Sequence, residues 1–362
     1  MPSLWIVTAT GGGRGSLPPR TRHEEVMLMR PTLRPGLVIA WRSPTALQLG
    51  LDDPHPVVLS GLSPAGRSVL DLMDGTRTVD QIASQLPSVD PEQVRDVVSR
   101  LDSIGALIDA GLWPGGRGQP ARRREQLLPD LLATAPADPD RWWTALATTQ
   151  VTVVGASRLG GVIARALSES GIGSVSVDDH RLVTADDVSL GGFSTSDIGT
   201  SRSDLLRAHP GPPRSGRRRT MLRELKVLTD AVDLDEHATD LTSRGLPYLV
   251  VTCLERSGAI GPLVDPGTTA CHFCVELHRR DADPAWPDLW RQRTWSQSPV
   301  ALASTVAVTA HLAAAQVVSW ALGEPTPAAS GVLTVDGRRG TSIRQPLGPH
   351  PECGCTWRPL AS

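Results

Sequence analysis

Four of the five cysteines stand in two closely spaced pairs, and these pairs constrain the fold of the 362-residue chain more than any other feature. Cys271 and Cys274 are separated by two residues, and Cys353 and Cys355 by Gly354 alone. A tetrahedral four-cysteine zinc site needs two such pairs, because each short spacing turns the backbone around the metal. A closed shell of four thiolates leaves no position for water, so we expect a structural zinc that pins the C-terminal tail to the rest of the chain. Two buried thiol pairs, or a redox disulfide, are the alternatives.

A repeated strand and helix pattern follows residue 150. Residues 151–155 form an unbroken apolar run that ends in a glycine turn, and residues 159–170 have the spacing of an amphipathic helix. A second strand is expected at 174–177, and further strands at 225–228 and 248–252. This alternation predicts an α/β domain with a doubly wound, mostly parallel Rossmann-like sheet covered by helices on both faces.

The glycine turn matches part of the dinucleotide-binding fingerprint. Gly155 and Gly160 occupy the first and last glycine positions, but Ser157 stands where the middle glycine lets the backbone approach a phosphate. Asp178, at the end of the next strand, is placed to hold a ribose hydroxyl. The partial fingerprint supports the fold more strongly than it supports a bound nucleotide.

The region before this domain has a different pattern. Short strand-like runs at 37–41, 46–49 and 57–59 precede three helical patterns at 63–73, 78–86 and 91–103, and a closing strand is expected at 106–108. Three strands and three short helices suggest a winged helix-turn-helix. We therefore divide the chain into a disordered arm (1–30), a winged-helix domain (31–110), a linker rich in Gly, Pro and Arg (111–140) and the α/β domain (141–362).

Charge and hydropathy argue against two classes of partner. The chain has 36 basic and 38 acidic side chains, so its charge gives no electrostatic case for nucleic acid or a membrane surface. Residues 301–322 are nearly uncharged and about as long as a bilayer span, but they are built on alanine, which is only weakly hydrophobic. We expect a buried helix there, no membrane partner and a cytoplasmic protein.

The order of these motifs resembles the ThiF/MoeB superfamily of ubiquitin-activating-like adenylyltransferases. Working members of that superfamily use an arginine in an Asn-Leu-x-Arg-Gln stretch and a lysine soon after an Ile/Val-Gly pair. Here the stretch 187–193 has no arginine, Arg202 stands where the lysine is expected, and Lys226 is the only lysine in the chain. The resemblance therefore implies a vestigial nucleotide site at Gly155, Ser157, Gly160 and Asp178, with no catalytic residue and no ATP cofactor.

A narrower resemblance rests on several segments taken together. They are Arg-Pro-Gly-Leu at 34–37, Gln-Leu-Gly at 48–50, Gly-Pro-Leu-Val-Asp-Pro-Gly at 261–267, Leu-His-Arg-Arg at 277–280 and His-Pro-Glu-Cys-Gly-Cys at 350–355. As a set, over about residues 30–357, they look like the ThiF-like cyclodehydratase partners of azoline and thiopeptide biosynthesis. This implies a PqqD-like domain that binds the leader of a ribosomally made precursor peptide. The protein would present that peptide to a YcaO-type cyclodehydratase as a non-catalytic scaffold.

The strand pattern agrees with peptide binding. An open edge strand can accept a peptide as an added strand, and we expect that edge at Val57, Val58 and Leu59. The third helix would line the groove with Arg95, Val98 and Asp102. A DNA-reading winged helix is the alternative, but the acidic side chains of that helix make it poorly suited to phosphate contact. An active adenylyltransferase is the other rival, and a homodimer is left open.

Overall fold

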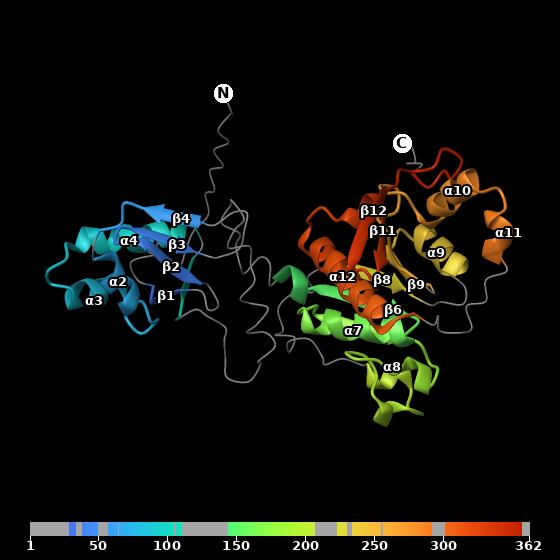
Figure 1. Ribbon diagram of the computed structural model, residues 1–362, viewed down its shortest axis with the longest axis horizontal. Coiled ribbons are helices and arrows are strands. Elements are labelled where there is room, and N and C mark those ends of the chain that lie inside the picture. Colours follow the sequence, from blue (N-terminus) through green and yellow to red (C-terminus); the bar gives the residue numbers. More distant parts are fainter. Residues whose placement is uncertain are drawn as a thin grey trace, which may run out of the picture. The chain divides into compact units, whose positions relative to one another are not determined.

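The computed structural model describes residues 29–33, 38–49, 57–63, 65–104, 106–110, 144–206, 223–229, 234–254, 256–291 and 301–356. They form two compact units, an N-terminal unit within residues 29–110 and a C-terminal unit within residues 144–356 (Figure 1). The predicted linker at 111–140 lies outside the described residues, as does nearly all of the predicted arm at 1–30.

The N-terminal unit contains two small antiparallel sheets. Strands β2 (Ile39–Ser43), β3 (Ala46–Leu49) and β4 (Val57–Ser60) pair in that order, so β2 and β4 are the edges of a three-stranded sheet. The short strand expected near 106–108 is β5 (Leu107–Asp109), and it pairs with β1 (Pro31–Leu33) instead of joining the larger sheet. The sequence pattern did not reveal β1, because a three-residue strand is too short to show a periodicity.

Three helices accompany these strands, α2 (Gly66–Leu72), α3 (Val79–Gln85) and α4 (Pro91–Ser103). The start of α4 follows from its sequence, because Asp90 accepts a hydrogen bond from the Glu92 N–H and Pro91 is the first helical residue. Helix α2 begins later than its Ser-Pro signal at 63–64 suggests. The three helices and the larger sheet share one core, built from Leu47, Val69, Ile82, Val94, Val97, Val98 and Leu101, among others.

The C-terminal unit is built on a seven-stranded sheet with the order β12-β11-β10-β9-β8-β6-β7. Its strands are β6 (Thr149–Val154), β7 (Ser174–Asp178), β8 (Arg223–Leu228), β9 (Tyr248–Cys253), β10 (Gly258–Val264), β11 (Gly331–Asp336) and β12 (Thr341–Pro346). Strands β7, β6, β8 and β9 are parallel, as the sequence predicts, whereas β10, β11 and β12 each run antiparallel to the strand before them. The expected Rossmann-like half is therefore extended by an antiparallel half.

Helices cover both faces of this sheet (Figure 1). Helices α7 (Arg158–Glu169) and α12 (Ala303–Leu322) share a hydrophobic core with one face. On the other face, α9 (Leu234–Ser243) and α10 (His272–Ala282) pack in a separate core with side chains of β8 and β9, such as Leu228 and Tyr248. Helix α11 (Trp286–Arg291) follows α10, and α8 (Arg202–Leu205) with three short 3-10 turns (Ala185–Asp187, Thr195–Asp197, Pro327–Ser330) completes the unit.

Helix α12 is the one helix in the described part of the chain that is long and apolar enough to cross a bilayer by length and composition. Half of that apolar stretch is buried inside the unit. Its inward face includes Ala310, Ala313 and Val317, which have no exposed surface and belong to the same core as α7. The helix is thus a core element of the C-terminal unit, which is the role its alanine-rich sequence predicts.

Candidate functional site

The glycine turn joins β6 to α7, and its backbone geometry explains its glycines. Gly155 has a φ of 80°, in the left-handed region that favours glycine, and its N–H donates to the Asp178 carbonyl at 3.2 Å. A Cβ on Gly160 would overlap the Gly155 carbonyl oxygen, so the helix approaches the turn closely because residue 160 has no side chain. The hydroxyl of Thr229, at the end of β8, donates to the carbonyls of Val154 and Gly155 and ties the turn to the neighbouring strand.

The predicted nucleotide residues meet at this turn only in part. Gly155, Ser157 and Gly160 lie together, with Ser157 as the N-cap of α7. The Ser157 hydroxyl is buried and has no hydrogen-bond partner among the described residues. Asp178 is exposed at the end of β7, opposite Val154 in the sheet register. Its neighbour Asp179, which sequence reasoning did not select, contacts the turn directly.

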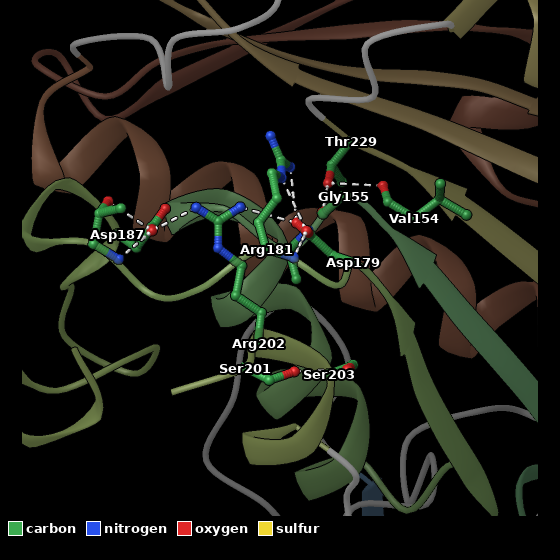
Figure 2. A network of polar contacts seen from close by, with 11 residues as sticks. Val154, Gly155, Asp179, Arg181, Asp187, Ser201, Arg202, Ser203 and Thr229 are labelled. Carbon is green, nitrogen blue, oxygen red and sulfur yellow. Dashed lines mark hydrogen bonds and ion pairs between the residues drawn. The ribbon is translucent and has the colours of Figure 1, made fainter. Parts of the chain in front are cut away.

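Asp179 is buried and receives hydrogen bonds from three sides (Figure 2). Its Oδ2 accepts from the Ala156 N–H of the glycine turn at 2.8 Å and from Arg202 at 2.9 Å, and Arg181 donates to both carboxylate oxygens at 2.8 and 2.9 Å. Burial alone would raise the pKa of Asp179. The donors from Arg181, Ala156 and Arg202 outweigh burial and hold that pKa far below its usual range. The group is therefore an anion that neutralises cations beside the turn.

Arg202 lies between two buried carboxylates, as Figure 2 shows. Its guanidinium contacts Asp179 at 2.9 Å and Asp187 at 2.5 Å, and only 5% of the residue is exposed. Asp187 has no exposed surface and also accepts from the backbone N–H and hydroxyl of Thr184, each at 2.8 Å. We call Asp179, Arg202 and Asp187 the buried ion triad. Its cation, Arg202, is the residue at which the sequence resemblance predicts a lysine, and its two carboxylate partners belong to the protein itself.

The only lysine lies away from this turn. Lys226 is on β8, as its sequence context predicts, and its amine is 3.8 Å from the Glu224 carboxylate. Within the described residues, Arg202 and Arg181 are therefore the cations bound to the buried carboxylate beside the glycine turn.

The four predicted metal ligands come together in the C-terminal unit. Cys271 is the N-cap of α10 and Cys274 lies in its first turn, while Cys353 and Cys355 belong to the tail. The sulfur atoms lie within 4.8 Å of one another, with separations of 3.4 Å for Cys271 and Cys353, 3.4 Å for Cys274 and Cys355, and 4.0 Å for Cys271 and Cys274. A tetrahedral site with metal–sulfur bonds of about 2.3 Å needs sulfur separations of about 3.8 Å. The cluster therefore fits a four-coordinate metal ion.

Polar contacts hold the tail against α10 around this cluster. The His350 backbone N–H donates to Cys274 Sγ at 3.2 Å, and the His350 ring contacts the Asp281 carboxylate of α10 at 2.9 Å. The hydrogen bond between Cys271 and Cys274 lowers the pKa of Cys274 and raises that of Cys271, so Cys274 is the thiol of this pair that ionises first. Gly354, with a φ of 69°, makes the sharp turn between the two tail cysteines.

The predicted peptide edge is in the N-terminal unit. Strand β4 is an edge strand, with Val57 half-buried, Val58 38% exposed and Leu59 buried. Arg100 of α4 donates to the carbonyls of Ser60 and Gly61, so the helix is tied to the end of this strand.

The three helix residues assigned to the groove share one side of α4 by their spacing but differ in burial. Arg95 is partly exposed and pairs with Glu92 at 2.9 Å, and Asp102 is also partly exposed. Val98 has no exposed surface and packs in the core with Val94, Val97 and Leu101, so its assignment to an open groove needs correction. The helix is more tightly packed than its sequence suggests, because four apolar positions face inward where three were expected.

Several solved structures share the fold of this chain. No protein-family model matches the sequence, and no curated protein matches it. Among solved structures, E. coli MccB in complex with succinimide is similar over 90% of this chain and 98% of its own, with a TM-score of 0.62 and 15% identity. MccB with ATP has a TM-score of 0.58 and 15% identity, over 90% of this chain and 99% of its own. The heterocyclase TruD has a TM-score of 0.56 and 21% identity, and 90% of this chain matches 42% of TruD.

Proposed function

We propose that this protein binds the leader of a ribosomally made precursor peptide and presents that peptide to a YcaO-type cyclodehydratase that forms azolines. In this proposal residues 31–110 are a PqqD-like winged-helix domain, 111–140 are a linker, and 141–362 are a ThiF-like scaffold. The fold supports the assignment to peptide modification, because MccB is the microcin C7 biosynthetic enzyme crystallised with MccA, its precursor peptide, and TruD is a heterocyclase.

The free edge of β4 supports the peptide-binding role. A leader peptide added there would satisfy the main-chain groups of the edge strand, and the exposed Val58 side chain would give apolar contact. Arg95 and Asp102 of α4 are the polar side chains proposed to contact the peptide. Val98 instead supports the helix from inside the core.

The buried ion triad is the single observation that carries the scaffold role. A nucleotide phosphate needs a cation with donors directed at it, and the guanidinium of Arg202 is already held by two buried carboxylates. Moving Arg202 toward a phosphate would leave Asp187 buried without its counter-ion and Asp179 with Arg181 as its remaining cation, which costs several kcal/mol. We therefore propose that the glycine turn is retained for structure and that ATP is not a cofactor.

The four-cysteine cluster is proposed to hold a structural zinc ion. Four thiolates suit zinc, and a closed shell of this kind has no open position for a substrate or a water nucleophile. We propose that the metal fixes the tail against α10 and that the protein acts in the cytoplasm, where reduced thiols favour metal binding over disulfides.

A titration of a fluorescent leader peptide from the cognate precursor tests the proposal. We expect Val58→Glu to weaken binding by about tenfold or more, because it places a charge on the strand that would pair with the peptide. Val38→Glu is a matched control, because Val38 is an exposed valine beside β2, at the opposite edge of the same sheet. Equal affinity in the Val58 and Val38 variants would reject β4 as the peptide edge.

The similarity to MccB favours an active adenylyltransferase as a second candidate, since that fold is found with ATP and with AMPCPP. ATP–pyrophosphate exchange by the purified protein with the precursor peptide distinguishes the two. Exchange above background that disappears in Arg202→Ala would support adenylation and reject the scaffold role.

A further inference from the structure

A cavity of about 430 Å³ lies beside the four-cysteine cluster. None of its lining residues belongs to β4, the edge strand proposed to bind the leader peptide, or to the glycine turn. Residues of α9, α10, α11 and the tail line it, with Cys353 and Glu352 on the tail side. Its volume is in the range of about 300–1,000 Å³ that is typical of ligand sites. The cavity belongs wholly to the C-terminal unit.

The walls of this cavity are mainly aromatic and apolar, with Phe273, Leu277, Trp286, Pro287 and Trp290 among its lining residues. The rings of Trp286 and Trp290 are 5.8 Å apart and tilted by 37°, and the His272 ring lies 5.7 Å from Trp290. The guanidinium of Arg279 lies 5.0 Å from the centre of the Trp286 ring. These separations are those of favourable ring pairs, so a further ring in the cavity could make the same kind of tilted ring contact.

The polar groups around these rings already have partners. The Trp286 indole N–H donates to Glu276 at 2.6 Å, and the Trp290 N–H donates to Asp235 at 3.1 Å. Arg280 contacts Glu352 at 2.9 Å, and Arg291 pairs with Asp288. Because the charges are paired with one another, the cavity suits an uncharged ring better than a free anion or cation. The paired groups at its rim also offer donors and acceptors to a peptide backbone.

The tryptophans among the described residues are all partly exposed. The chain has ten tryptophans, two phenylalanines and one tyrosine. The fully buried aromatic side chains are Phe193 and Tyr248, whereas none of the described tryptophans is buried. Two of them line this one cavity while remaining partly exposed. Partly exposed tryptophans around a hollow are typical of binding sites, in which they supply a large apolar contact area.

We propose that this cavity binds one aromatic side chain of the precursor peptide. The inference rests on the proposed function for the identity of the peptide, and it adds a second contact point outside the N-terminal unit. One wall is formed by Glu352 and Cys353, so the shape of the cavity depends on the same tail that the cysteine cluster holds.

The test uses the full-length, metal-loaded protein and the probe acetyl-Ala-Ala-Trp-Ala-Ala-amide, with the central alanine analogue as reference. Calorimetry or saturation-transfer NMR should detect binding of the tryptophan peptide. The alanine peptide should bind at least about tenfold more weakly. N-acetyltryptophanamide is the free-ring arm. Because it carries the same side chain, it should bind to a similar extent, and no binding of either tryptophan ligand would overturn the proposal.

Two variants locate the binding. Trp290→Ala removes one side of the cavity, whereas Leu277→Trp fills the cavity with a larger side chain. Each variant should weaken binding of the pentapeptide by about tenfold or more. Trp320→Ala is the matched control, because Trp320 is a partly exposed tryptophan of α12 that stacks with Arg223 away from the cavity lining. If Leu277→Trp keeps its fold and metal content and still binds the pentapeptide with unchanged affinity, the assignment of binding to this cavity is overturned.

The same assay separates this inference from the leader-binding proposal. Val58→Glu should leave pentapeptide binding unchanged while it weakens the leader. Loss of pentapeptide binding in Val58→Glu would place the probe in the N-terminal unit and reject the cavity. In the opposite case, Val58→Glu would leave leader binding unchanged while Leu277→Trp abolishes pentapeptide binding. That result would reject β4 as the leader-binding strand and would support the cavity.

Discussion

The buried ion triad and the four-cysteine cluster lie in the same C-terminal unit, and they differ in whether the protein supplies the positive charge of the site. In the triad, the cation of Arg202 is supplied by the chain and is enclosed by the carboxylates of Asp179 and Asp187. In the cluster, four sulfur atoms converge within 4.8 Å of one another, and no cationic side chain of the described residues contacts them. Four converging thiolates repel each other unless an ion neutralises them.

The triad therefore contains its own cation, whereas the cysteine cluster needs a bound metal ion to balance its charge. In the triad, Arg202 is already paired with two protein carboxylates, although Asp187 Oδ1 and Arg202 Nε have no hydrogen-bond partner among the described residues. An incoming phosphate would have to compete with those carboxylates for Arg202. The cluster has the spacing of a metal shell and gains its stability when an ion binds.

The largest effect should come from breaking the cluster. Cys274→Ser should lower the zinc content from about one ion per chain to nearly none and should release the tail. The loss of stability should exceed any other predicted here, because structural zinc contributes about 10–16 kcal/mol of binding free energy in zinc-finger peptides. Metal analysis and thermal unfolding measure both quantities.

Cys253→Ala is the control for this prediction, because Cys253 is buried in β9 and is not among the four clustered cysteines. It should keep its zinc. Full zinc content in Cys274→Ser would reject the cluster as the metal site.

A smaller effect should follow from breaking the triad. Arg202→Ala leaves two buried carboxylates without their shared cation, so we expect a loss of about 3–5 kcal/mol in the free energy of unfolding, measured with denaturant. Arg181→Ala is the comparison variant and should cost less, because the Arg181 side chain is 45% exposed, so water can replace it, and Asp179 keeps Arg202. Equal losses in the two variants would contradict the assignment of Arg202 as the principal cation of the triad.

The smallest effect should be the acid dependence of the triad. The pKa of Asp179 in the folded protein is below its ordinary value of 3.8, so its contribution to stability is present above that value and is lost as the pH falls below about 4. Asp179→Asn should therefore have a flatter stability profile in this acid range than the parent protein. Asp178→Asn, which changes the exposed neighbouring residue, is the control and should have the same dependence of stability on pH as the parent protein. The same dependence in Asp179→Asn would exclude Asp179 as the titrating group.

Much of the local structure was predictable because local patterns determine it. The apolar run before Gly155 and the helical spacing after it predict β6 and α7, and Asp90 followed by proline predicts the start of α4. Strand β12 was not predicted, because it is exposed along its whole length and has no apolar alternation to reveal it.

The sequence by itself determined the two cysteine pairs, the glycine turn and the missing lysine, since each depends on residue identity at short spacing. Only the tertiary structure decided that Arg202 lies between Asp179 and Asp187, which are 23 and 15 residues away along the chain. It also decided that Val98 is in the core and that Trp286 and Trp290 border a cavity beside the tail. The physical reason is that spacing along the chain sets backbone conformation, whereas the partner of a buried charge or ring depends on which distant elements the sheet brings together.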